Sequence, residues 1–214
     1  MACPFASGDI LCHRRFVASS FGPPYTSIWH RDSAGEWHFY QDTSAEQSCA
    51  RYFGSALTSA TETRISSVWT DARTLQLSTP NIDWTLSLAA TPVTRALNGI
   101  GSVMPESLWR SERVLGLMSR IAGRALGAGR MQLAGTTPNR QYFVANPLRI
   151  WVLTKASATI GGRSLGTLAV SSEQAALGDF WIPRRGLFAV GQSYFEPFDP
   201  ERHLSADPQP SPGA

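Results

Sequence analysis

Two histidines, His30 and His38, form the local arrangement with the clearest chemical potential. Residues 32–35 between them read Asp-Ser-Ala-Gly, which suits a type I turn followed by glycine in the left-handed region. A hairpin with this turn makes the two histidines cross-strand neighbours, with about 5 Å between their Cβ atoms. Such a pair can shuttle a proton or bind a metal, but no third ligand is evident and we expect no metal. The alternatives are a solvated sheet face and a polar pocket.

Lys155 is the second candidate, because it is the one lysine beside eighteen arginines. It follows Trp151 and Leu153 at two-residue spacing, so we expect it on their face of a strand. A desolvated lysine has a lowered pKa and can form an imine, whereas a lysine whose ammonium group reaches solvent is structural. Asp83 and Asp179 are further candidates for acid or base function.

Aromatic side chains are abundant, with seven Trp, ten Phe and five Tyr. Trp84 shares one face of its predicted strand with leucines, and Trp151 does the same on another strand. These faces must turn inward, since exposed stripes of this kind promote aggregation. We therefore expect an apolar pocket bounded by Trp84 and Trp151, although aromatic rings can equally fill a core.

Motifs for common cofactors are missing from the chain. No glycine-rich phosphate loop, dinucleotide turn or nucleophile elbow is present, so we expect no cofactor. The three cysteines, Cys3, Cys12 and Cys49, include no Cys-x-x-Cys pair and are expected to be buried and unpaired.

The composition is typical of a folded domain. Of 214 residues 43% are hydrophobic and 16% charged, with a net charge of +3. We expect one domain over residues 1–204 and a disordered, proline-rich tail over 205–214. The arginines are scattered, so no nucleic-acid partner is expected, and no apolar stretch is long enough to span a membrane. Since the first ten residues do not resemble a signal peptide, a cytoplasmic location is expected.

Alternation of polar and apolar residues predicts mainly antiparallel β-structure. It is clearest over residues 74–78 and 82–88, which a Pro-Asn turn joins into a hairpin. Residues 26–41 form the histidine hairpin, and residues 149–160 form a long strand that turns at two glycines.

Two helices are predicted. A short one covers residues 43–54, with Thr43 and Glu46 as a capping box. A long amphipathic one covers residues 105–126 and ends at Gly127. Its arginine-rich face is either solvated, a docking surface for a partner, or a basic face for an anionic membrane surface.

Many alternating strands, tryptophan-rich hairpins and the lack of cofactor motifs make the chain resemble a lipocalin-like barrel. It is similar in outline to the two-barrel proteins of the carotenoid hydratase class and to some barrel-shaped natural-product cyclases. The resemblance is architectural and implies an antiparallel barrel, but it transfers no functional residue.

The sequence thus favours binding of a hydrophobic small molecule in a barrel cavity. Cofactor-free catalysis in the same cavity, by an isomerase, hydratase or cyclase, is the alternative. The expected ligand-binding residues are Trp84, Trp151, His30, His38 and Lys155. A cavity that contains a titratable group favours the enzyme, and one lined by Trp, Phe and Leu favours the binder. The sequence does not determine the ligand or the oligomeric state.

Overall fold

The computed structural model describes residues 1–204, so the predicted tail at 205–214 lies outside the described residues. Strands account for 42% of the chain and helices for 20%, which confirms a mainly β protein. Strands of the first half are β1 (Ala2–Pro4), β2 (Ile10–Phe16), β3 (Tyr25–Arg31), β4 (Trp37–Gln41), β5 (Ser59–Glu62), β6 (Ser66–Trp69), β7 (Thr74–Ser78) and β8 (Ile82–Ala89). Strands of the second half are β9 (Ala134–Thr136), β10 (Tyr142–Ile160), β11 (Arg163–Thr167), β12 (Ala176–Leu177), β13 (Phe180–Trp181) and β14 (Leu187–Phe195).

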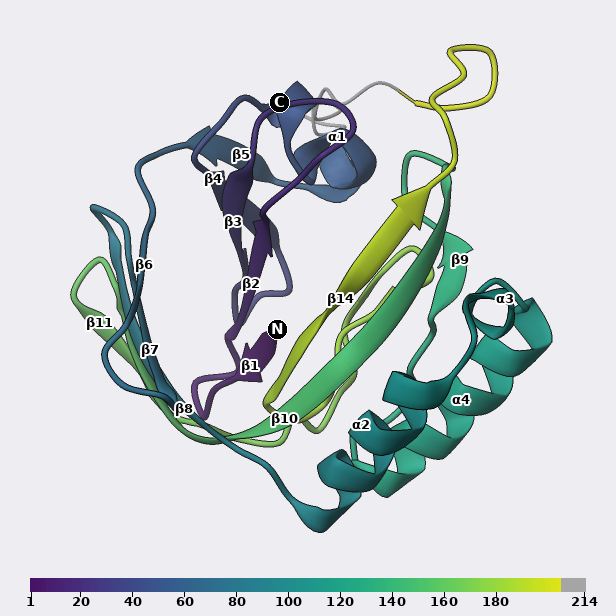
Figure 1. Ribbon diagram of the computed structural model, residues 1–214. Coiled ribbons are helices and arrows are strands. Elements are labelled where there is room, and N and C mark those ends of the chain that lie inside the picture. Colours follow the sequence, from purple (N-terminus) through teal and green to yellow (C-terminus); the bar gives the residue numbers. More distant parts are fainter. Residues whose placement is uncertain (205–214) are drawn as a thin grey trace.

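Twelve of these strands form one strongly curled sheet (Figure 1). Its order is β5-β4-β3-β2-β1-β14-β10-β8-β7-β6, with β9 and β11 also paired to β10. All pairs are antiparallel except β4 with β5. The edge strands β5 and β6 are not paired with each other, so the sheet is a half-barrel and not the closed barrel that the sequence suggested.

Strand β10 holds the two halves of the sheet together. Its first part pairs with β14, and its last part pairs with β8 and β11. Register shifts occur at Pro147/Arg149 and at Leu153/Lys155. Bulges of this kind bend a strand and increase its twist, which explains how one strand serves both walls of the half-barrel.

Both predicted hairpins are confirmed. His30 pairs with His38 across β3 and β4, and Gly35 in their turn has φ +97°. Leu77 pairs with Trp84 across β7 and β8. The inner face of β7 and β8 forms one core cluster with residues of β2 and β3. The other face of β2 to β4 packs on a second cluster with α1 and β13, so this part of the sheet is buried on both sides.

The predicted helix over residues 105–126 is interrupted. It consists of α3 (Glu106–Trp109) and α4 (Glu112–Ala125), with an extended residue, Ser111, between them. Trp109 and Leu115 are both buried in one cluster, yet a continuous helix would place them about 120° apart around its axis. The break allows both to reach the core. Gly127, with φ +60°, ends α4 as predicted, and α4 is the longest helix among the described residues.

A further helix, α2 (Pro92–Val103), was not predicted. Thr91 caps it in a capping box with Thr94, and Pro92 occupies its first position. The Thr-Pro pair was the available signal, but Gly99 and Gly101 weaken the helical pattern. Figure 1 shows α2, α3 and α4 together on the outer side of β10 and β9.

The predicted helix over residues 43–54 is divided into three short pieces. They are η1 (Ala45–Gln47), α1 (Ala50–Phe53) and η2 (Gly54–Ala56). The capping box is wrong, because Thr43 bonds the side chain of Gln47 and Ser44 is the residue at the helix start. No helix in the described part of the chain is long and apolar enough to cross a membrane.

Candidate functional site

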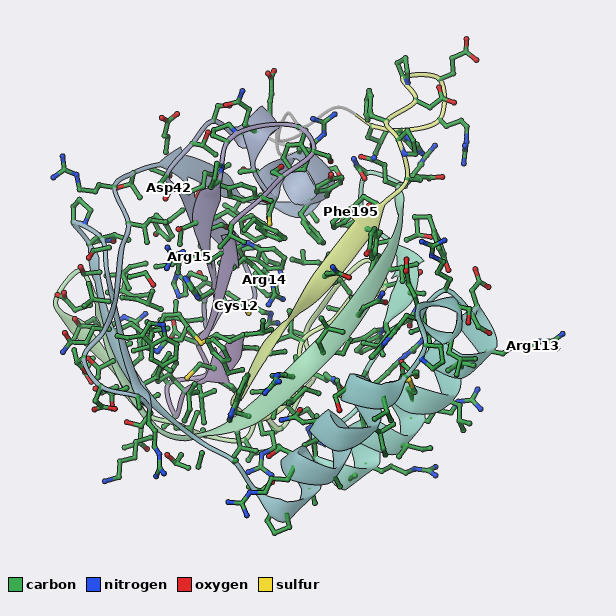
Figure 2. All side chains as sticks on the ribbon, viewed as in Figure 1. Cys12, Arg14, Arg15, Asp42, Arg113 and Phe195 are labelled. Carbon is green, nitrogen blue, oxygen red and sulfur yellow. The ribbon has the colours of Figure 1, made fainter. Side chains whose placement is uncertain are left out.

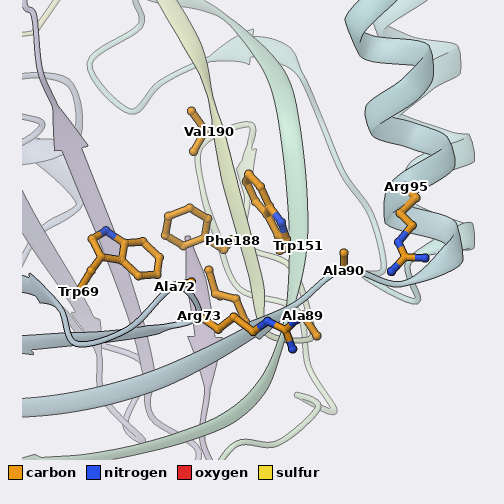
Figure 3. Close-up of a pocket in the computed structure, with 10 residues that line it drawn as sticks. Trp69, Ala72, Arg73, Ala89, Ala90, Arg95, Trp151, Phe188 and Val190 are labelled. Atoms are coloured by element: carbon orange, nitrogen blue, oxygen red, sulfur yellow. The ribbon is translucent and has the colours of Figure 1, made fainter.

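A pocket of about 570 Å³ opens where the β6–β7 turn, the end of β8, the middle of β10, the start of β14 and the first turn of α2 meet. This volume is within the range of small-molecule sites. Its lining comes from five separate segments, which are shown in Figure 3: Trp69, Ala72, Arg73, Leu88, Ala89, Ala90, Arg95, Trp151, Phe188 and Val190.

Three aromatic rings form the apolar side of this pocket. Phe188 lies between Trp69 and Trp151, with ring centroids 5.8 Å and 5.9 Å away and edge-to-face geometry. Trp69 remains 45% exposed and Val190 50% exposed. Large apolar side chains exposed together mark interaction or ligand surfaces more often than isolated ones do.

Two arginines, Arg73 and Arg95, supply the polar side. The turn that carries Arg73 is held by Asp71, whose carboxylate accepts backbone N–H bonds from Arg73 (2.7 Å) and Thr74 (2.9 Å). Arg95 lies in the second half of the first turn of α2. Within residues 1–204, neither guanidinium group has a carboxylate within 4.0 Å.

The lining of this pocket offers few kinds of chemical group. Among the described residues, its only charged groups are the two arginines, and no Asp, Glu, His, Cys or Lys lines it. Arginine stays protonated at all ordinary pH values and is a poor general acid or base. The pocket can bury an apolar body and pair with an anionic group, but its own side chains offer no proton transfer near neutral pH.

The sequence-predicted residues are distributed over several places. Trp151 lines the pocket, whereas Trp84 is 1% exposed and lies in the core cluster that Trp151 and Phe188 contact from the side. Trp84 does not line this pocket, and its Nε1 has no hydrogen-bond partner among the described residues.

Lys155 is exposed and does not share a face with Trp151 and Leu153 as expected. The register shift between Leu153 and Lys155 is the reason, because an extra residue reverses the alternation. Asp83 is also exposed. Asp179 accepts a bond from the backbone N–H of Thr136 (2.9 Å), which is a structural role.

His30 is buried against a carboxylate that the sequence analysis did not identify. Its Nε2 lies 2.7 Å from Oδ1 of Asp9, and Arg163 donates to both oxygens of Asp9 at 3.0 and 3.2 Å. Burial raises the pKa of Asp9, but the hydrogen bonds from Arg163 and His30 outweigh it and bring the pKa to about 2. Burial lowers the pKa of His30 despite the nearby Asp9, so a neutral His30 donates to an ionised Asp9.

His38 stands beside His30, with 5.8 Å between the ring centroids. Its Nδ1 is 2.9 Å from Ser59 Oγ, and its Nε2 is 3.7 Å from Asp32 and 4.0 Å from Glu36. Candidate ligand atoms of Asp32, Glu36 and His38 all lie within 4.8 Å of one another. However, the Asp32 carboxylate already accepts the backbone N–H of Glu36 at 2.8 Å, as is usual in a turn.

The histidine network connects two distant parts of the sheet. Asp9 precedes β2, His30 is on β3, and Arg163 begins β11. The network joins the paired strands β2 and β3 to the β10–β11 hairpin, and its residues do not line the aromatic pocket. The solvated sheet face considered for the histidines is thus excluded for His30, which is 5% exposed.

Several residues of the pocket and of the histidine network were not predicted from the sequence. Phe188 and Trp69 lie on strands, but nothing in the chain shows that these strands converge. Arg95 could have been found only by recognising the Thr91–Pro92 helix start. Asp9 follows Ser7 and Gly8, and Arg163 follows two glycines, so each is in a turn-like context that does not suggest a buried ion pair.

Comparisons with known proteins add no relative: no protein family model, no curated protein and no solved structure matches this chain. The described fold is barrel-like in its curled sheet. The resemblance to lipocalin-like proteins rests on that architecture alone.

Proposed function

We propose that the protein binds a hydrophobic small molecule that carries an anionic group, in the pocket of Trp69, Trp151 and Phe188. The observation that carries the proposal is the pairing of half-exposed aromatic rings with two arginines that lack carboxylate partners among the described residues. The rings would gain about 25 cal/mol for each Å² of apolar area removed from water. The guanidinium groups would orient the anionic end through charge-assisted hydrogen bonds.

Cofactor-free catalysis gains no support from this pocket. An isomerase, hydratase or cyclase needs a group that transfers a proton or stabilises a developing charge. The histidines, Lys155, Asp83 and Asp179 all lie outside the lining. Binding is therefore the function that the pocket supports best.

A pair of fluorescent probes tests the proposal. The first, 1-anilinonaphthalene-8-sulfonate, has an aromatic body and an anionic group; the second, N-phenyl-1-naphthylamine, has the same rings without the charge. We expect both to bind at micromolar concentrations and the sulfonate to bind more tightly. Arg95→Gln and Arg73→Gln should each weaken the sulfonate about tenfold and leave the neutral probe unchanged. Trp151→Ala should weaken both.

The matched controls are Arg64→Gln, which removes an exposed arginine outside the pocket, and Arg120→Gln with Arg124→Gln, which removes two arginines of α4. These variants should bind both probes as the wild type does. Absence of micromolar binding, or equal loss of the sulfonate in the controls and in the pocket variants, would contradict the proposal.

A further inference from the structure

The layer of α2, α3 and α4 exposes an unusual amount of apolar surface. Fourteen large hydrophobic residues are exposed in the described chain, and six of them lie in this layer. They are Val93, Ile100, Val103, Leu108, Leu117 and Ile121. A helix that only covers a sheet would turn such residues toward the sheet, so these helices carry large apolar side chains that the fold does not bury.

On α4 the exposed apolar residues run beside a row of arginines. Leu117 is 59% and Ile121 53% exposed, and their spacing of four places them one turn apart on the same face. Arg113, Arg120 and Arg124 lie on the neighbouring strip of the helix, as the 100° step per residue requires. Figure 2 shows Arg113 pointing away from the body of the molecule.

The positive charge of the protein is concentrated here. Residues 106–130 hold five arginines and two glutamates, a net charge of +3 that equals the net charge of the whole chain. In the described part of the chain, the arginines with a carboxylate within 4.0 Å are Arg110, Arg163 and Arg202. Arg113, Arg120 and Arg124 are not among them, so their charge is available to a partner.

A basic groove of about 470 Å³ continues this face at the carboxyl end of α4. Within residues 1–204, four arginines and no acidic residue line it: Arg120, Arg124, Arg130 and Arg184. Gly123 and Gly129 line this groove and approach each other closely, since a side chain at Gly123 would collide with the backbone oxygen of Gly129. Clustered guanidinium groups of this kind suit phosphate oxygens.

We propose that the exposed face of α4, together with the basic groove beside it, docks on an anionic phospholipid membrane surface. Leu117 and Ile121 enter the boundary between headgroups and acyl chains, while the arginines of α4 and of the groove pair with lipid phosphates. Helices that lie in a membrane interface have this combination of an apolar face and flanking basic residues. Long arginine side chains keep their charge at the headgroup level while their stems lie on apolar surface.

Charge and surface chemistry favour this occupant over two others. A second copy of the chain would bring the same arginine-rich face against this one, and the repulsion between like charges costs free energy at short distance. A nucleic acid would satisfy the arginines but would leave the aliphatic side chains without an apolar environment. A bilayer with anionic lipids satisfies both groups at once.

The test uses flotation of the full chain with vesicles. We expect binding to vesicles of phosphatidylcholine with 30% phosphatidylglycerol, weak binding to phosphatidylcholine alone, and loss of binding as NaCl is raised. The double variant Arg120→Gln/Arg124→Gln should bind about 30-fold more weakly. Leu117→Ser/Ile121→Ser should bind about tenfold more weakly.

Matched controls carry the same changes elsewhere on the surface. Arg15→Gln/Arg64→Gln removes two exposed arginines outside the face, and Val17→Ser/Val170→Ser removes two exposed valines; both should float like the wild type. Circular dichroism confirms that each variant is folded. Three results would overturn the proposal: no binding of the wild type to anionic vesicles, equal loss in control and face variants, or a dimer in sedimentation that Leu117→Ser/Ile121→Ser dissociates. The probe experiment on the aromatic pocket is independent of all three.

Discussion

The carboxylate of Asp9 is fully buried and ionised, which is rare unless the charge is paired. Its partners are His30 and Arg163, from two parts of the sheet that are far apart in the chain. A buried carboxylate that loses such partners leaves uncompensated polar groups in the core. The network therefore positions the β10–β11 hairpin against β3.

Replacement of Asp9 by Asn should lower the free energy of unfolding by about 2–4 kcal/mol at pH 7. Because the folded-state pKa of Asp9 is about 2, below the usual 3.8, its contribution is fully present above pH 3.8. It is lost as the pH falls toward 2. Urea denaturation from pH 7 to pH 3 measures this, and the difference from wild type should narrow below pH 4. Asp83→Asn, at an exposed position, should change little; a pH-independent difference for Asp9→Asn would show that its charge is not responsible.

His13 gives the protein a second pH dependence. Burial, reinforced by nearby positive charges that include Arg14 and Arg15, lowers its pKa to about 3. Its Nε2 has no partner among the described residues. In the unfolded chain the same imidazole titrates near pH 6.5. The unfolded state thus takes up a proton below pH 6.5 while the folded state does not.

The free energy of unfolding should accordingly decrease as the pH is lowered from 6.5 to 3. This residue contributes up to about 1.4 kcal/mol per pH unit to the decrease. His13→Leu should reduce that slope, since leucine does not titrate. Chemical denaturation at pH 7, 6 and 5 measures it, and thermal unfolding at the same pH values provides an independent check. An unchanged slope in the variant would place the pH dependence in other groups, such as His30.

At the scale of elements, α2 completes the edge of β10. Between its pairings with β9 and β8, β10 has backbone groups on that side with no strand beside them. The amide of Asn98 on α2 takes this place: Nδ2 donates to the carbonyl of Ile150 (3.0 Å) and Oδ1 accepts its N–H (2.7 Å). A helix thus satisfies both backbone groups of one strand residue, as a neighbouring strand would.

Asn98→Ala should destabilise the protein by about 2–3 kcal/mol, because it leaves two partly buried backbone groups without a partner. Hydrogen exchange at the amide of Ile150 should become faster, and the free energy of opening calculated from its exchange rate should decrease by the same amount. Ser102→Ala, on the exposed side of α2, is the matched control and should have little effect. A slow Ile150 amide in Asn98→Ala would mean that another group protects it.

At the scale of the whole molecule, the curl of the sheet places two tryptophans of one core cluster in different environments. Trp84 is enclosed between the walls of the half-barrel, and Trp151 lies at its rim beside the pocket. The same residue type therefore serves the core in one place and the candidate site in the other.

Trp84→Ala should lower the free energy of unfolding by about 3–5 kcal/mol. Trp84→Phe should cost less, since it keeps most of the buried area and removes an unpaired N–H. It should leave the affinity for the sulfonate probe within about twofold, a free-energy change below 1 kcal/mol, whereas Trp151→Ala weakens it. Urea denaturation and probe titration measure the two effects; a folded Trp84→Phe that loses the probe would place the ligand against Trp84.

The sequence by itself determined what depends on neighbours along the chain. Period-two alternation predicts β7 and β8, the Asp-Ser-Ala-Gly turn predicts the pairing of His30 with His38, and Gly127 predicts the end of α4. These features rest on backbone sterics and on a periodicity that is visible within ten or twenty residues.

Only the tertiary structure decided how these pieces meet. The burial of Trp109 breaks the long helix, the bulge before Lys155 turns that side chain outward, and Asn98 finds its partner 52 residues away. The ion pair of Asp9 with Arg163 spans 154 residues, and the pocket is lined by five segments. Such contacts form because distant residues compete for the same buried space and hydrogen bonds, and no local pattern records the result of that competition.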